Sequence, residues 1–160
     1  MQFVCADGLD GIAPGAADTV VCCGMGGDLI VSLIENKPWL RNGKTELILQ
    51  AQSGLPDLRQ WLADNGFLIV REIPVQDHRF LYSVMLVRYD GERRTISAGE
   101  RFVSPAMLRE DTPLVKAYWQ RMVRSVEATL KSFENTDQDG DKREQFRLAA
   151  EDLKRMGECL

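Results

Sequence analysis

The sequence has few of the residues that build metal and disulfide sites. It contains one histidine, His78, and its four cysteines, at positions 5, 22, 23 and 159, form no CxxC pair. Zinc sites use histidine and cysteine ligands at short, regular spacings, so we predict no metal site. Cysteines without a disulfide pattern are typical of a reducing compartment, which predicts a cytoplasmic protein.

Long apolar runs are also absent. No segment approaches the roughly 20 apolar residues that cross a bilayer, and the amino terminus lacks the basic and apolar regions of a signal peptide. We therefore predict neither membrane insertion nor export. Hydrophobic residues still make up 44% of the 160 residues, which is enough to form the core of one domain plus an appendage.

The chain is organised around residues 18–27, Asp-Thr-Val-Val-Cys-Cys-Gly-Met-Gly-Gly. The apolar run Val20–Cys23 predicts a strand that is buried on both faces, in which Cys22 and Cys23 each fill core. A helical pattern follows directly, at Leu29, Ile30, Leu33 and Ile34. Open α/β sheets bind ligands at the carboxyl ends of their strands, so the candidate site comprises Gly24, Met25, Gly26 and Gly27. The glycines are equally consistent with a turn alone.

The rest of residues 2–66 alternates between strand and helix patterns. Gln2–Ala6 looks like the end of a strand before an acidic turn, and Glu46–Gln50 supplies a further strand. Leu55–Leu62 has helical spacing and ends at Asn65-Gly66, a good carboxyl-terminal cap. This βαβα order predicts an α/β fold with a parallel sheet and right-handed crossovers.

Two β-rich runs follow, Phe67–Val75 and Phe80–Tyr89. The four residues between them are too few for a crossover, so the two strands are predicted to pair antiparallel. Residues 90–111 are polar and lack a period, which predicts a linker that packs along the domain. We therefore expect a first domain, residues 1–111, whose sheet ends in an antiparallel hairpin.

Residues 112–160 predict a second domain of two helices. Thr112-Pro113 is a helix start, and apolar residues then recur at three- and four-residue spacing at Val115, Trp119, Met122, Val126, Leu130 and Phe133. After a turn predicted at Asn135–Asp141 the pattern returns at Phe146, Ala149, Leu153, Met156 and Leu160. This spacing predicts a two-helix antiparallel coiled coil. Helices that only cover the domain and a partner-binding arm fit it equally well.

Several motifs occur in an order that resembles one enzyme family. They are Asp7-Gly-Leu9, Gly24-Met-Gly-Gly27, Leu47-Ile-Leu-Gln50, and Leu58-Arg-Gln-Trp-Leu62 with Asn65-Gly-Phe67. Together with the hairpin and the helical tail, they resemble the bacterial tRNA (adenine-22-N1)-methyltransferases of the TrmK type. The resemblance implies a partial Rossmann-like class I methyltransferase fold. It also implies S-adenosyl-L-methionine (SAM) as cofactor and methyl transfer to N1 of an adenine in tRNA.

The resemblance implies roles for single residues. Asp7, with Gly8 and Leu9, would lie beside the adenine ring of SAM, and residues 24–27 would line the cleft between methyl donor and target base. Gln50 and Gln52 are the candidate catalytic residues, because an amide can hydrogen-bond the edge of an extruded base. For each glutamine, a structural or solvent-exposed role fits equally well. The family usually has Gln-Pro-Asn here, so Gln50-Ala-Gln52 is expected to position the substrate differently.

The family's first two strands, which carry its glycine-bearing SAM loop and ribose-binding acidic residue, have no counterpart in this sequence. We therefore expect the sequence to correspond to the carboxyl-terminal two-thirds of the enzyme and the chain alone to be inactive. An unpaired sheet edge would then favour a homo-oligomer. The alternative is a non-catalytic module that binds RNA or protein through a truncated methyltransferase fold.

The formal net charge of −4 is unevenly distributed. Residues 1–66 carry 8 acidic and 4 basic residues, and the remainder carries 16 of each. Nucleic-acid binding depends on local basic patches rather than on the total charge. Residues 67–160 therefore remain a candidate region for binding RNA. We predict that tRNA binds a basic ridge on the first long helix, formed by Lys116, Arg121, Arg124 and Lys131. Ordinary solvated helix charges are the alternative.

Overall fold

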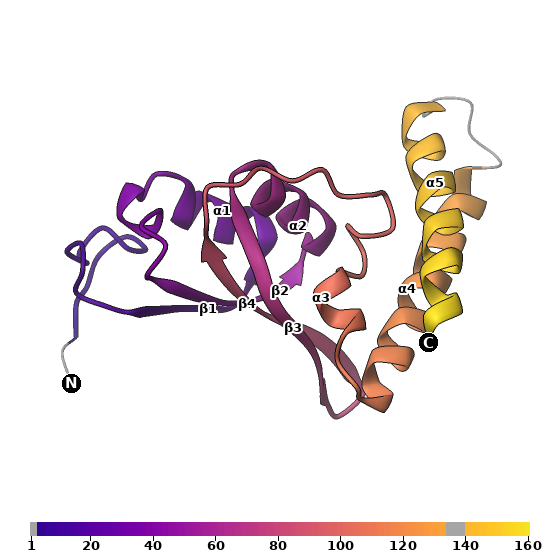
Figure 1. The fold of residues 1–160 in the computed structure, drawn as a ribbon, viewed down its shortest axis with the longest axis horizontal. Helices are drawn as coiled ribbons and strands as arrows, with labels where there is room; N and C mark the ends of the chain where they lie inside the picture. Colours follow the sequence, from indigo (N-terminus) through magenta and orange to yellow (C-terminus); the bar gives the residue numbers. More distant parts are fainter. Residues whose placement is uncertain (1–2, 134–139) are drawn as a thin grey trace. The chain divides into compact units, whose positions relative to one another are not determined.

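The computed structural model describes residues 3–133 and 140–160 (Figure 1). The elements are β1 (Thr19–Gly26), α1 (Gly27–Glu35), η1 (Pro38–Leu40), β2 (Glu46–Ser53), α2 (Leu55–Asp64), β3 (Phe67–Asp77), β4 (Phe80–Tyr89), α3 (Pro105–Leu108), α4 (Pro113–Ser132), α5 (Gly140–Met156) and η3 (Gly157–Cys159). Of the turn predicted at Asn135–Asp141, residues 135–139 lie outside the described residues, and its last two residues belong to α5.

The four strands form one mixed sheet in the order β1-β2-β4-β3. β1 and β2 are parallel, with Val20 opposite Leu47, and β4 runs antiparallel to β2, with Leu47 opposite Val87. The α/β fold and the antiparallel partner at the end of a parallel pair are therefore confirmed. β3 lies next to β4, and only His78 and Arg79 connect them, so these two strands form an antiparallel hairpin.

The described chain forms two compact units. The first comprises Met1–Arg71 and Val84–Arg94, and the second comprises Glu72–Ser83 and Thr95–Leu160. The far half of the β3–β4 hairpin thus belongs to the second unit. The division into domains 1–111 and 112–160 remains a prediction.

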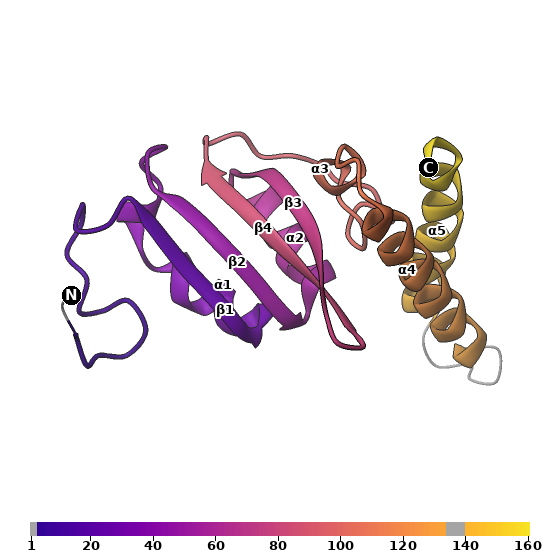
Figure 2. The same cartoon turned by 90° about the horizontal axis from the view of Figure 1, so that it is seen from below.

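In the first unit, α1 and α2 lie on the same face of the sheet (Figures 1 and 2). Along β1, Val20 and Cys22 are buried toward the core, whereas Val21 is 62% exposed and Cys23 is exposed. The prediction that β1 is buried on both faces, with Cys23 in the core, is therefore wrong, because the described helices of this unit cover one face. Cys22 does fill core: burial, and secondarily the neighbouring Cys23, raises the pKa of its thiol.

The predicted strand end at Gln2–Ala6 is also not found where the structure describes it. Residues 3–6 have no regular secondary structure, and Phe3 is 84% exposed. An extended segment becomes a strand only when a neighbour satisfies its backbone groups, and no described strand pairs with these residues. Apolar composition alone was an insufficient signal here.

The second unit has its own core, which includes Val103, Met107, Val115, Tyr118, Val126 and Leu153. Two of these residues lie in the segment that was predicted to be a plain linker. That segment contains the short helix α3, which is capped by the Ser104 hydroxyl accepting a hydrogen bond from the Met107 amide at 3.1 Å. A single helical turn is too short to show a period, so the sequence pattern missed it.

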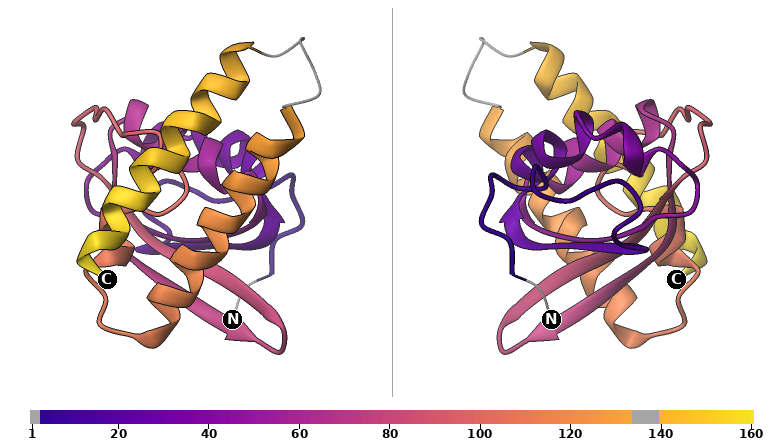
Figure 3. Two further views of the ribbon diagram at one scale, coloured as in Figure 1. Left: turned by 90° about the vertical axis from the view of Figure 1, so that its right-hand side faces the viewer. Right: turned by 90° about the vertical axis from the view of Figure 1, so that its left-hand side faces the viewer.

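Helices α4 and α5 run side by side in opposite directions (Figures 1 and 3). Trp119 Nε1 donates a hydrogen bond to the Leu153 carbonyl at 2.8 Å, and Val115 and Val126 are buried between the elements of this unit. The start of α4 at Pro113 is confirmed, although the Thr112 side chain makes no capping hydrogen bond. Coiled-coil geometry for the pair remains a prediction.

Candidate active site at the carboxyl ends of β1 and β2

The first glycine of the motif interrupts the register of β1. Cys23 lies opposite Gln50 and Met25 opposite Ala51, so Gly24 is an extra residue in β1. Its φ of +80° lies in the left-handed region that favours glycine. The Gly24 amide donates a hydrogen bond of 2.8 Å to Oε1 of Gln50. Two residues predicted to form the site therefore meet, at the ends of adjacent parallel strands.

Helix α1 begins against the end of β2. A Cβ built on Gly27 would lie 2.6 Å from the Gly54 carbonyl oxygen and 3.2 Å from that of Ser53. Backbone atoms cannot easily move aside, so this close approach requires glycine. Ser53 and Gly54 were not predicted as site residues. The signal available in the sequence was a glycine, Gly54, directly after the second strand of a parallel pair. In the structure its φ is positive, a conformation that favours glycine.

The orientation of the Gln50 amide is fixed. Its oxygen accepts from the Gly24 N–H, and exchanging the two ends of the amide would place one donor against another. Nε2 of Gln50 is buried and has no hydrogen-bond partner among the described residues. A buried donor left unpaired costs free energy, so it favours an acceptor atom from a ligand or from water, which reaches it once neighbouring side chains move aside.

Gln52 also lies near this glycine. Its side chain is exposed, and its Nε2 is the only described atom near a Cβ built on Gly24, at 3.9 Å. A Cβ at Gly24 would therefore meet no close contact among the atoms considered, although the positive φ still favours glycine. Met25 and Gly26 are partly buried, and a Cβ on Gly26 would lie 3.4 Å from the Ser53 hydroxyl. The structure thus brings Gly24–Gly27 together with both glutamines.

It does not bring the Asp7-Gly-Leu9 motif to the same place. Gly8 packs against the Leu33 side chain, since a Cβ on Gly8 would lie 2.2 Å from Leu33 Cδ2. Leu33 is six residues along α1 from Gly27, which is roughly 9 Å of helix. Asp7 is exposed, and Leu9 packs against the core of the first unit. A contact between this motif and SAM remains a prediction.

The four predicted RNA-binding residues are all exposed on α4. Two of them are engaged within the second unit: Lys116 Nζ donates to the Leu160 carbonyl at 3.2 Å, and Arg121 Nη1 donates to the Leu81 carbonyl at 2.7 Å. Arg124 and Lys131 make no hydrogen bond or ion pair with residues that the structure describes. They are the cations of this helix that are available to a partner.

The cations of α5 are more fully paired. Arg147 bridges Glu144 and Glu151 at 2.6 and 2.5 Å, and Lys154 reaches Glu127 of α4 at 2.9 Å. Among the described residues there is also no cluster of metal-ligating side chains and no helix long and apolar enough to cross a membrane.

Solved structures share this architecture. A protein of the NADB-Rossmann superfamily from Streptococcus agalactiae matches with a TM-score of 0.74 and 27% sequence identity, over 95% of this chain and 65% of that chain. Sp1610 from Streptococcus pneumoniae, crystallised in complex with S-adenosyl-L-methionine, matches with a TM-score of 0.71 and 25% identity, over 95% and 66%. The mixed sheet with its helices is therefore a Rossmann-like fold.

The family model for tRNA (adenine(22)-N(1))-methyltransferase, TrmK, matches residues 1–154. The chain belongs to this family. The tRNA (adenine(22)-N(1))-methyltransferase of Bacillus subtilis strain 168 is 27% identical over an alignment of 161 residues, gaps included. The alignment covers 96% of this chain and 66% of that protein. The chain thus spans slightly less than two-thirds of the length of the relatives that it matches.

Proposed function

We propose that this chain carries the base-binding part of a cytoplasmic, SAM-dependent methyltransferase that transfers a methyl group to N1 of an adenine in tRNA. Family membership and the SAM complex of Sp1610 support the proposal. The observation that carries it is the Gln50 amide, which is oriented by Gly24 and retains an unpartnered donor at the carboxyl ends of two parallel strands.

An oriented glutamine amide is suited to hold adenine without blocking N1. Glutamine makes a bidentate contact in which its N–H donates to N7 and its oxygen accepts from the N6 amino group. Nε2 of Gln50 has no other described partner, and Oε1 keeps a second lone pair beside the one used by Gly24. Held by this edge, the base keeps the N1 lone pair free. Gln52, which is exposed and lies near Gly24, is the second proposed contact.

Methyl transfer to N1 requires alignment of the adenine with the methyl donor rather than a strong base. SAM, when bound, supplies a methyl group on a positively charged sulfur. The N1 lone pair forms the new bond to carbon, the electrons of the broken bond return to sulfur, and the positive charge passes to the adenine ring. Residues of the site therefore need to orient the base and leave room for the methyl donor. Gly24, which is exposed and has no side chain, suits that role.

The cofactor contacts that we propose are Gly24, Met25, Gly26 and Gly27, with Asp7, Gly8 and Leu9 as more distant candidates. The absence of side-chain atoms at the glycines lets a ligand approach the backbone closely. For the tRNA, the proposed contacts are the exposed cations of α4, chiefly Arg124 and Lys131. Lys116 and Arg121 already serve hydrogen bonds within the second unit.

The test is methyl incorporation from labelled SAM into unmodified tRNA, with the protein expressed from its own gene together with any flanking coding sequence. Gln50→Leu is expected to lower kcat/KM by roughly 10- to 100-fold, because one bidentate base contact is lost. Gln145→Leu, an exposed glutamine on α5, is the matched control and should leave the rate unchanged. Wild-type rates in Gln50→Leu would refute the role of this amide.

A further inference from the structure

The far end of the β3–β4 hairpin carries an aromatic patch, formed by the exposed Arg79 and Phe80 and the partly buried Tyr82. Phe80 is 48% exposed, and its ring centroid lies 6.1 Å from that of Tyr82 with 35° between the ring planes. The Arg79 guanidinium carbon lies 5.1 Å from the Phe80 centroid. Two neighbouring rings and a cation thus form one surface on the second unit.

The strand pattern turns this patch outward. Side chains alternate between the faces of a strand, and on β4 Leu81 packs against the core of the second unit while Ser83 is fully buried. Phe80 and Tyr82 consequently face the other way. Burying two aromatic rings in the core would have been favourable, but Phe80 stays half exposed and Tyr82 only partly buried, so part of the ring surface is available to a partner.

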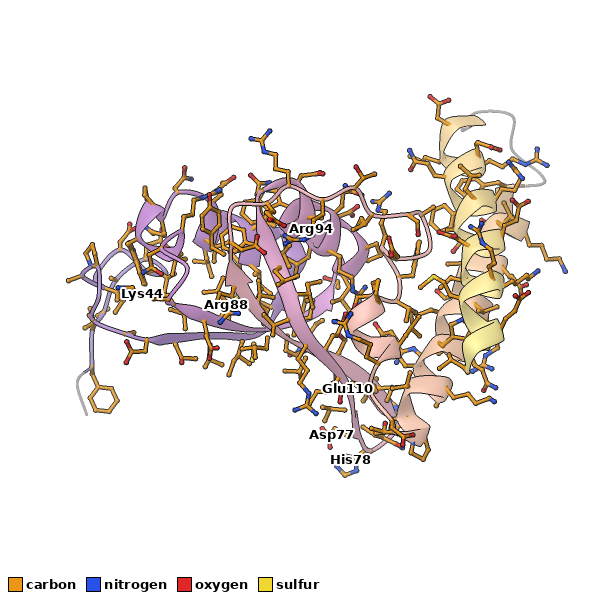
Figure 4. All side chains as sticks on the ribbon, in the orientation of Figure 1. Lys44, Asp77, His78, Arg88, Arg94 and Glu110 are labelled. Carbon is orange, nitrogen blue, oxygen red and sulfur yellow. The ribbon has the colours of Figure 1, made fainter. Side chains whose placement is uncertain are left out.

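The hairpin tip is held in a defined conformation. His78 has a φ of 49°, the only positive φ among described non-glycine residues, and Gln76 Nε2 donates to its carbonyl at 3.0 Å. Figure 4 shows Asp77 and His78 at the tip, where their side chains approach to 3.7 Å. Farther along the hairpin, the Ser83 hydroxyl donates to the buried Glu72 carboxylate. A strained, hydrogen-bonded turn presents its aromatic neighbours in a fixed orientation.

Positive charge lies beside the patch. Arg121 of α4 donates to the carbonyl of Leu81, the residue between Phe80 and Tyr82. Its guanidinium therefore lies at the strand that carries both rings. Together with Arg79, it places two cations at this part of the hairpin, and the Asp77 carboxylate lies near His78 at the tip. Aromatic rings flanked by cations match a nucleotide, which presents a flat base and a phosphate.

We propose that Arg79, Phe80 and Tyr82 bind an unpaired nucleotide of the substrate tRNA by stacking its base on the aromatic rings. Proteins recognise RNA mainly at loops and bulges, where bases are free to stack on aromatic side chains. Every base has a π face, so this contact supplies affinity and orientation without reading sequence. The inference rests on the proposed function, because it takes tRNA as the ligand.

The test measures the affinity of the full chain for unmodified tRNA at several salt concentrations, by fluorescence anisotropy. Phe80→Ala is expected to weaken binding by roughly 5- to 100-fold while leaving the salt dependence unchanged, because stacking releases no counterions. Arg79→Gln should weaken binding and reduce the logarithmic salt slope by about one. Leu148→Ala on α5 removes an equally exposed apolar side chain, 43% accessible, and should change neither quantity.

The remaining outcomes either refute the stacking inference or show whether the proposed enzymatic function fails independently of it. Wild-type affinity for tRNA in Phe80→Ala overturns the inference. If Phe80→Ala instead changes only self-association, measured by light scattering, the patch is a protein contact and the inference is also overturned. Phe80→Leu keeps the apolar bulk without the ring, so it should also bind weakly even if the alanine variant is unstable. Phe80-dependent binding without methyl transfer refutes the enzymatic proposal alone, and wild-type protein that binds no tRNA refutes both.

Discussion

At the scale of single residues, two adjacent glycines at the start of α1 differ in the space that each has for a side chain. A Cβ on Gly27 would meet the Gly54 carbonyl oxygen at 2.6 Å, whereas a Cβ on Gly26 would lie 3.4 Å from a side-chain hydroxyl. We expect Gly27→Ala to lower the free energy of unfolding by roughly 1–3 kcal/mol and Gly26→Ala by less than about 1 kcal/mol. Urea unfolding measures both, and equal midpoints would contradict the close approach of α1 and β2.

The carboxylate of Asp152 should make the stability of the folded chain depend on pH. The side chain of Asp152 is 11% exposed, and its carboxylate accepts a 2.9 Å hydrogen bond from the Gly99 amide and pairs with Arg155. Burial raises the pKa of this carboxyl, but hydrogen bonds from Ser97 and Gly99 and the Arg155 charge outweigh it and lower the pKa overall. The folded protein therefore binds fewer protons here than the unfolded chain, so the stability that Asp152 contributes is present at neutral pH and disappears in acid.

The measurement compares Asp152→Asn with the wild-type chain by urea unfolding from pH 7 down to pH 3. The variant should be less stable at pH 7, and the difference should shrink as the pH falls through the pKa of the folded carboxyl. Glu144→Gln is the control, because Glu144 is exposed and its pairing with Arg147 contributes little to stability. A difference that stays constant with pH would show that the Asp152 charge is unimportant.

The sequence alone identified several site residues but not their contacts. Gly24 and Gln50 were singled out as parts of strand ends, and the parallel pairing of β1 and β2 makes them neighbours. The bulge that aims the Gly24 amide at the Gln50 oxygen depends on a one-residue register shift, which no local pattern encodes. The placement of Gly8 against Leu33 likewise depends on tertiary packing.

At the scale of elements, the helices with long periods and the closely joined hairpin were predictable, whereas short or unpaired segments were not. α2, α4 and α5 each show apolar spacing over two or more turns, and they form as predicted. The single turn of α3 is too short to show such spacing, and residues 3–6 have no described strand partner. One-sided burial of β1 was missed because an apolar run does not reveal how many faces are covered.

The basic ridge of α4 gives a prediction at this scale. Replacing Arg124 and Lys131 together by glutamine should weaken tRNA binding and reduce the logarithmic salt slope by about two, because each cation that meets a phosphate releases counterions. Arg147→Gln is the matched control on α5, since Glu144 and Glu151 already hold that guanidinium. If the salt slope of the double variant equals that of the wild type, α4 does not contact the tRNA backbone.

At the scale of the whole molecule, we propose a homo-oligomer that forms through the sheet edge. β1 pairs with β2 on one side, no described strand pairs with its other side, and Val21 on this strand is 62% exposed. Exposed strand edges recruit further strands, and lysine on such strands opposes this pairing. Val21→Lys should therefore shift the chain toward monomer in light scattering. Leu29→Lys, at a 52% exposed site on α1, should not. A monomeric wild type at all concentrations would contradict the proposal.

The central claim, methyl transfer to N1 of one adenine in tRNA, is tested most directly by locating the methyl group. The gene product, with any flanking coding sequence, is incubated with SAM and an unmodified tRNA transcript, and nuclease fragments are analysed by mass spectrometry. The account predicts 1-methyladenosine at position 22, the position named for the family, and no product when that adenine is replaced by guanine. Methylation at another atom or position, or transfer that is indifferent to the replacement, would contradict it.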